Sequence, residues 1–164
     1  VRIGEILIEQ GVLNEQQVLE IVQAQKRLRL PFGLVAERLH DVTLESIERA
    51  WAEQYHRFTG TLDLETQTID PEATRLITRR QAWQFEILPI GFDEAGELVI
   101  AASRGRLARA VTFVAGRVEP VAYFRIAEEA QLRGLLREHY PMPEVSPEML
   151  DKARDFGANP NTAA

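Results

Sequence analysis

The sequence contains no cysteine and no long apolar run, and these two absences exclude several classes of protein. Without cysteine the chain forms no disulfide, no thiolate metal site and no cysteine nucleophile. No apolar stretch approaches the ~18 residues that a membrane-spanning helix needs, so we expect no direct insertion into a membrane. No signal peptide is recognisable and the first residue is not methionine. We therefore expect a piece of a longer, cytoplasmic protein.

Positive charge is also scarce. The chain has 19 Lys and Arg residues against 25 Asp and Glu residues, a net charge of −6. This balance excludes a chain that binds duplex DNA or an anionic membrane surface through overall charge. Hydrophobic residues make up 45% and charged residues 27% of the 164 residues, which is typical of a globular protein. This length accommodates one domain or two small ones.

Residues 1–60 have the pattern of a helical segment. Asn14 and Thr43 each occupy a position typical of a helix N-cap, and each is followed by a stripe of apolar residues at helical spacing. Basic residues and then Pro31 follow the first stripe, as expected at a helix C-terminus. Shorter helices, at about residues 3–10 and 33–39, are expected before each long helix.

Residues 61–140 combine short apolar runs with helical segments. A turn at residues 93–96 separates two of these runs and predicts a β-hairpin. A helix start at Asp70-Pro71-Glu72 precedes the hairpin, and a later helix is expected to end at a C′ glycine, Gly116. The expected elements are strands at 87–92, 98–102 and 118–124, and helices at 107–115 and 127–139.

The predicted fold class is therefore α+β. An all-helical N-terminal half with two tandem repeats of a short and a long helix is followed by a small α+β half with about three strands. The expected domains are a helical, ligand-binding half at 1–60 and an α+β half at 61–140. Residues 141–164 contain four prolines and are expected to form a loose tail, with one amphipathic turn from Ser146-Pro147-Glu148 to Gly157.

An internal repeat is the most informative feature of the sequence. Residues 31–54 superimpose on residues 2–25 without gaps, and chemical type agrees better than identity. Three pairs carry the repeat: Gly4 with Gly33, Gln25 with Gln54, and the two expected N-caps.

Each repeat places two apolar side chains and an amide on one helix face. Val18, Val22 and Gln25 are spaced i, i+4, i+7, and Ile47, Trp51 and Gln54 have the same spacing. The glycine that opens each short helix permits close approach of another group, and the nearby helix amides can meet an anion. The less specific interpretation is that the stripes belong to the core and the glycines serve packing, which is the commoner role of such residues.

The two repeats resemble the 24-residue motifs of the MshEN-type domain, the N-terminal module of type II secretion and type IV pilus ATPases. Arg2-Ile3-Gly4 and the first stripe resemble the first motif, whereas Pro31-Phe32-Gly33 and the second stripe resemble the second. A five-residue spacer at 26–30 separates them, and the resemblance extends over roughly residues 1–140.

The resemblance implies that the chain binds cyclic di-GMP along both repeats. Its guanines would stack on Arg2 and lie against the stripes. The second repeat departs from the family at His40, where glycine is expected, and at Phe32 and Trp51, which replace smaller residues. These two aromatic residues either stack on a base or fill the groove. The implied ligand-binding residues are Arg2, Ile3, Gly4, Val18, Val22, Gln25, Pro31, Phe32, Gly33, Ile47, Trp51 and Gln54.

The predicted function is a regulatory module that couples cyclic di-GMP binding to an attached or neighbouring effector. The effector is a secretion or pilus ATPase, or a membrane glycosyltransferase-like protein that would place the module on the cytoplasmic side of the inner membrane. The alternative is a protein-docking module of a secretion or envelope assembly, with an inner-membrane protein as its partner. No phosphate-binding loop, metal-ligand spacing or catalytic constellation is recognisable, so we expect neither an enzyme nor a metal site.

Overall fold

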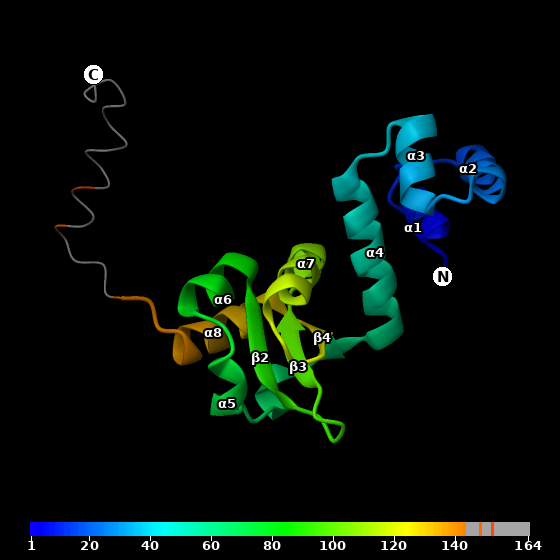
Figure 1. The fold of residues 1–164 in the computed structure, drawn as a ribbon. Helices are drawn as coiled ribbons and strands as arrows, with labels where there is room; N and C mark the ends of the chain where they lie inside the picture. The colour runs from blue at the N-terminus through cyan, green and yellow to red at the C-terminus, as the bar shows by residue number, and fades with distance from the viewer. Residues whose placement is uncertain (144–147, 149–151, 153–164) are drawn as a thin grey trace.

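The computed structural model describes residues 1–143, 148 and 152. Most of the amphipathic turn expected at residues 146–157 lies outside the described residues. Four helices form the N-terminal part, and α4 is the longest of them (Figure 1). Their bounds are α1 (Ile3–Glu9), α2 (Glu15–Leu28), α3 (Phe32–His40) and α4 (Leu44–Thr59).

Side-chain caps begin the two long helices where the sequence predicted them. The Asn14 side chain accepts a hydrogen bond from the backbone N–H of Gln17, at 2.9 Å, and Thr43 accepts one from Ser46, at 3.2 Å. These caps satisfy backbone donors that have no partner within the helix. The order of short and long helices, α1–α2 followed by α3–α4, confirms the predicted tandem repeat.

The second repeat differs from the first at the end of its short helix. Gly11 has a φ of 70° after α1, whereas His40 stays helical and Asp41 adopts the left-handed conformation with a φ of 51°. Aspartate tolerates this conformation better than most residues with a side chain. Histidine at position 40 is therefore accommodated by moving the turn one residue along the chain.

The C-terminal part is a four-stranded sheet surrounded by helices (Figure 1). The strand order is β1-β4-β3-β2, with β1 and β3 parallel to β4 and the β2–β3 hairpin antiparallel. The strands are β1 (Thr61–Leu62), β2 (Ile87–Phe92), β3 (Leu98–Ala102) and β4 (Ala122–Ala127). The helices are α5 (Pro71–Thr74), α6 (Arg79–Phe85), α7 (Leu107–Arg117) and α8 (Glu129–His139), with 3-10 turns η1 (Leu64–Thr66) and η2 (Arg104–Arg106).

Several predicted boundaries in this part are wrong. The last strand begins at Ala122 rather than at residue 118, because Ala122 is the residue that pairs with Leu98 at the start of β3. Gly116 is not a C′ glycine: α7 continues through it to Arg117, and the chain leaves the helix in an extended conformation at Val118. The two-residue strand β1 and helix α6 were not predicted.

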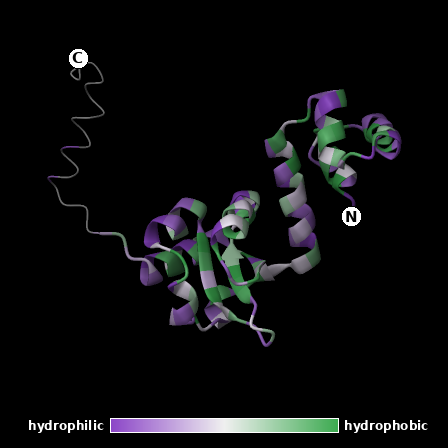
Figure 2. Cartoon of the chain, viewed as in Figure 1, coloured by the Kyte–Doolittle hydropathy of each residue, from purple (hydrophilic) through white to green (hydrophobic). Residues whose placement is uncertain are grey.

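Two separate clusters of buried side chains stabilise the fold. The helical cluster draws on α1 to α4 and the loops between them, and the larger cluster surrounds the sheet. Helix α4 contributes to both, because Ala50 belongs to the helical cluster and Ala52 to the sheet cluster. Figure 2 shows that α4 is mostly hydrophilic or intermediate in hydropathy along its length, so its contacts with the two clusters involve few residues. We use "helical half" for α1 to α4 and "α+β half" for the remaining described elements; α4 packs in both clusters.

Candidate ligand-binding site

The glycine of each repeat packs against the long helix of the same repeat. A Cβ atom added to Gly4 would lie 2.8 Å from Cγ1 of Val18, and one added to Gly33 would lie 3.2 Å from Cγ2 of Ile47. Both contacts join a glycine to the first residue of the following stripe. The close approach that glycine permits is therefore used within the protein in both repeats.

Phe32 also packs inside the helical half. Its ring lies 3.5 Å from the position that a Gly4 Cβ atom would occupy, and the side chain packs against the helical cluster together with Ile3. Three of the predicted ligand-binding residues therefore meet at one place, because Gly4 contacts Val18 and lies beside Phe32. The meeting point is part of the packing between the two repeats.

The other predicted residues of the first repeat, and Pro31 of the second, lie nearer to solvent. Arg2 and Pro31 are exposed and are the N-cap residues of α1 and α3. Val22 and Gln25 are half-buried on α2. Among the described residues, Arg2 has no ion-pair partner, so its guanidinium is available to a ligand.

Trp51 and Gln54 line an open pocket of about 430 Å³ on α4. The Gln54 amide donates a hydrogen bond to the backbone carbonyl oxygen of Val1, at 3.0 Å. Trp51 packs against Tyr55, with ring centroids 5.9 Å apart and planes tilted by 37°. Phe58 completes the aromatic wall and is 91% exposed. We call this cavity the aromatic pocket; its lining residues are Val1, Trp51, Gln54, Tyr55, Arg57 and Phe58.

The sequence interpretation missed two of these aromatic residues. Trp51, Tyr55 and Phe58 are spaced i, i+4, i+7, the spacing that drew attention to Trp51 and Gln54. An aromatic stripe at this spacing was therefore a usable signal. Tyr55 is held in place because its hydroxyl donates to the carbonyl oxygen of Phe124 in β4, and burial raises its pKa.

Arg57 provides the positive charge of the aromatic pocket. Its guanidinium pairs with Glu9 of α1, where Nη2 and Oε2 are 2.5 Å apart, and with Glu53 of α4, where Nε and Oε1 are 2.9 Å apart. These hydrogen bonds lower the pKa of both carboxyl groups and raise the pKa of Arg57. Both glutamates therefore remain ionised well below neutral pH.

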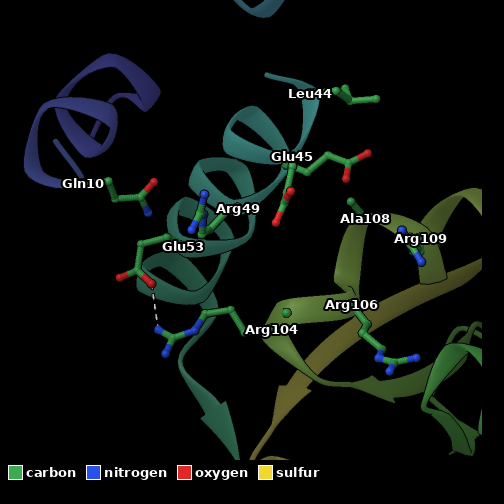
Figure 3. Close-up of a pocket in the computed structure, with 11 residues that line it drawn as sticks. Gln10, Leu44, Glu45, Arg49, Glu53, Arg104, Arg106, Ala108 and Arg109 are labelled. Carbon is green, nitrogen blue, oxygen red and sulfur yellow. Dashed lines mark hydrogen bonds and ion pairs between the residues drawn. The ribbon is translucent and has the colours of Figure 1, made fainter. Parts of the chain in front are cut away.

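A larger, charged cleft separates α4 from the segment that contains η2 and the start of α7 (Figure 3). Its volume is about 920 Å³. One ion pair crosses it, between Arg104 Nη1 and Glu53 Oε2, at 2.7 Å. The charged residues that line the cleft are Glu45, Glu48, Arg49 and Glu53 on one wall, and Arg104, Arg106 and Arg109 on the other.

No group of three or more His, Asp or Glu side chains in the part of the chain that the structure describes is arranged to hold a metal ion. Likewise, none of the helices in this part combines the length and the apolar character needed to cross a bilayer.

The comparison with protein families identifies the chain. The model of the MshEN domain matches residues 54–146, more than half of the sequence. The chain belongs to the MshEN domain family. The match begins at Gln54, the last residue of the second repeat. Most of the residues in the two repeats therefore lie outside the segment that matches the MshEN model.

Solved structures similar to this MshEN chain include two that cover most of it. MshE with cdg is 25% identical over 85% of this chain and 99% of the other, with a TM-score of 0.48. The N-terminal domain of XpsE is 20% identical over 85% of this chain and 93% of the other, with a TM-score of 0.46. The search of the curated proteins found no match.

Proposed function

We propose that this MshEN domain binds cyclic di-GMP and transmits its binding to an attached or neighbouring effector, in the cytoplasm. The observation that carries the proposal is the aromatic pocket on α4. Trp51 and Gln54 line it, and both belong to the stripe that the second repeat places on one helix face. Membership of the MshEN domain family supports the same interpretation.

The chemistry of the aromatic pocket suits a guanine nucleotide. Trp51, Tyr55 and Phe58 offer flat apolar surfaces on which a base can stack. Gln54 supplies both a donor and an acceptor for the polar edge of the base, after exchanging its bond to Val1. A volume of about 430 Å³ lies within the range of small-molecule sites.

The first repeat is proposed to bind the other half of the same ligand. Val22 and Gln25 are half-buried rather than sealed within the protein, and Arg2 is exposed. A guanidinium can stack on a base or pair with a phosphate. Gly4, Val18, Phe32, Gly33 and Ile47 act on the ligand through the packing that they give the two repeats, and Ile3 and Pro31 set the start of the two short helices.

Helix α4 provides a physical route from the ligand to the rest of the molecule. The aromatic pocket lies on α4, which packs against both hydrophobic clusters. A ligand that binds one placement of α4 more tightly than another increases the population of that placement. The proposed effector, an ATPase or a glycosyltransferase-like protein, would respond to this change.

Isothermal titration calorimetry with cyclic di-GMP tests the proposal. We expect a dissociation constant in the micromolar range or tighter, of the order expected for a specific small ligand, ~−8 kcal/mol or more favourable. Gln54→Ala and Trp51→Ala should weaken binding at the second repeat, and Arg2→Ala and Gln25→Ala at the first. Gln16→Ala is the matched control, because Gln16 is exposed on α2 and lies outside the predicted stripe. Circular dichroism checks that each variant is folded.

A protein-docking module is the second candidate function. The observation in its favour is Phe58, a large aromatic residue that is 91% exposed. Exposed aromatic side chains are often anchors at protein interfaces. If the folded protein gives no heat with cyclic di-GMP, cyclic di-AMP or GTP, the nucleotide proposal is wrong and docking to an inner-membrane protein becomes the leading hypothesis.

A further inference from the structure

Four charged side chains form a continuous series of ion pairs from α1 to η2. Glu9 pairs with Arg57, Arg57 with Glu53, and Glu53 with Arg104. The two oxygens of the Glu53 carboxylate are divided between two arginines: Oε1 accepts from Arg57, at 2.9 Å, and Oε2 from Arg104, at 2.7 Å. One carboxylate therefore joins the helical half to the α+β half.

This series of ion pairs also links the aromatic pocket to the cleft between α4 and η2. Arg57 lines the aromatic pocket, whereas Glu53 and Arg104 line the cleft between α4 and η2 (Figure 3). The Glu53 side chain is only 22% exposed, so solvent screens its interactions less than those of a fully exposed group. A change in the ion pairing of Arg57 therefore alters the ion pairing of Arg104, because Glu53 alone lies between them.

Arg57 retains capacity to bind an anion. It uses its Nε, Nη1 and Nη2 atoms to donate one hydrogen bond each, to Glu53 and Glu9. A guanidinium has five N–H groups, so two have no partner among the described residues. The Arg57 side chain is 36% exposed at the rim of an aromatic wall. A nucleotide that stacks a base on this wall brings its phosphate close to this guanidinium.

We propose that Arg57 contacts a phosphate of the bound nucleotide, and that Glu53 relays this contact to Arg104 across the cleft. The inference rests on the proposed function. The phosphate competes with the two carboxylates for Arg57 and repels them. Glu53 then interacts mainly with Arg104, which increases the population of the arrangement in which α4 lies closest to η2. His56 supports this geometry, since its Nδ1 atom lies 3.3 Å from Nη1 of Arg104 and its Nε2 atom 2.8 Å from the Thr61 hydroxyl.

The first experiment measures affinity. Arg57→Gln should weaken cyclic di-GMP binding about tenfold or more, as expected when a charge-assisted contact to phosphate is lost. Arg57→Lys should recover part of this loss, because lysine keeps the charge but not the planar fork. Arg49→Gln is the matched control: Arg49 is exposed on the same helix and lines the cleft rather than the aromatic pocket.

The second experiment measures the relay. Because the chain has no cysteine, a single pair of labels can be attached at Glu45→Cys on α4 and Arg109→Cys on α7, on opposite walls of the cleft. Pulsed electron spin resonance then gives the distance between nitroxide labels with and without cyclic di-GMP. We expect the ligand to shorten and narrow this distance distribution. Glu53→Gln and Arg104→Gln should still bind the ligand but should lose the shift.

The outcomes separate this inference from the function on which it rests. If the unmodified chain binds no cyclic di-GMP, the proposed function and the relay are both wrong. If it binds and Arg57→Gln binds equally well, the phosphate contact is wrong and the proposed function stands. If Glu53→Gln or Arg104→Gln retains the full change in distance, the relay is wrong even though the ligand binds.

Discussion

The two halves of the molecule differ in the size of the hydrophobic core that stabilises each of them. Among the residues that the structure describes, the helical cluster contains nine buried residues and the sheet cluster 21. Alanine makes up a third of each cluster, three of nine and seven of 21, so the two clusters differ in size rather than in composition of this kind. Small cores provide little net stability after the entropic cost of folding. The half that carries most of the predicted ligand-binding residues is therefore the half with less to stabilise it.

The charged side chains that form ion pairs are also more exposed in the helical half than Glu86 is in the α+β half. The helical half contains one partly exposed ion pair, Glu9 with Arg57, and is joined to the α+β half by another, Glu53 with Arg104. The α+β half instead has Glu86, which is 6% exposed and pairs with Arg106 and Arg133. The Glu86 carboxylate is buried although both arginines are 44–46% exposed, so losing these partners would leave a buried charge without compensation. The contrast suggests a rigid α+β platform and a helical half whose placement a ligand can change.

Two matched leucines give the largest test of this comparison. Leu7 in α1 and Leu132 in α8 are both fully buried, one in each cluster. Truncation to alanine should cost about 2–5 kcal/mol in either place, because a cavity replaces the lost methyl groups. In the small helical cluster this loss should unfold α1 to α3 while the sheet remains folded. Two-dimensional NMR spectra recorded through a urea titration would resolve the two halves.

Leu132→Ala should behave differently from Leu7→Ala. In Leu132→Ala the larger cluster should stay folded in water at 25 °C. It should unfold at a lower urea concentration than the same cluster of the unmodified chain. If both variants lose all native signals together, in one transition, the two clusters form a single cooperative unit and the proposed difference between the halves is wrong.

The sequence predicted those features that depend on neighbouring residues. Asn14 and Thr43 cap their helices through backbone groups only three residues away. The β2–β3 hairpin follows from Asp93, whose carboxylate accepts from the backbone of Ala95 and Glu97, and from Gly96, whose φ of 79° suits the turn. Such interactions leave a signature within a short stretch of sequence.

Features that depend on distant residues were not predictable in this way. Strand β1 has two residues and exists because it pairs with β4, more than 60 residues later. The ion pair between Glu53 and Arg104 joins residues 51 positions apart. For the candidate site, the sequence predicted that Trp51 and Gln54 share one helix face, and both line the same pocket. It gave no sign that Phe32 packs beside Gly4, because that contact depends on how the two repeats meet.

Glycine-to-alanine substitutions compare the packing of the two repeats within the helical half. We expect their effect on stability to be smaller than that of the leucine substitutions. A Cβ atom at Gly4 would lie 2.8 Å from Val18, a stiff β-branched residue, whereas at Gly33 the nearest atom would be 3.2 Å away, on Ile47. We expect Gly4→Ala to destabilise the helical half by about 1–3 kcal/mol through overpacking, and Gly33→Ala by less. Thermal unfolding monitored by circular dichroism measures both changes.

Gly134 is the control for these two substitutions. It lies within α8, and an added Cβ atom would contact nothing within 4 Å. Gly134→Ala should stabilise the protein by about 0.5–1 kcal/mol, because alanine favours helix more than glycine does. A Gly4→Ala variant that is as stable as Gly134→Ala would show that the repeats are not packed through Gly4.

The smallest expected effect is the pH dependence of the ion pairs around Arg57. The pKa values of Glu9 and Glu53 are lowered from 4.5 by their hydrogen bonds to Arg57. A carboxyl group whose pKa is lower in the folded than in the unfolded protein stabilises the fold above its unfolded pKa. This contribution is lost as the pH falls through the folded pKa. The helical half should therefore lose stability progressively below about pH 4.5, and more steeply than the double variant Glu9→Gln/Glu53→Gln.

The control for this measurement is Glu72→Gln, which removes an exposed ion pair with Arg75 on α5, in the other half. Urea titrations at several pH values between 3 and 6, followed by the NMR signals of α1 to α3, compare the three proteins. Because α1 is tied to α4 through Glu9 and α4 to η2 through Glu53, protonation should loosen the helical half before the sheet. An identical pH profile for the double variant and the unmodified chain would mean that these pairs do not hold the helical half in place. The difference between the halves would then rest on the size of their apolar cores alone.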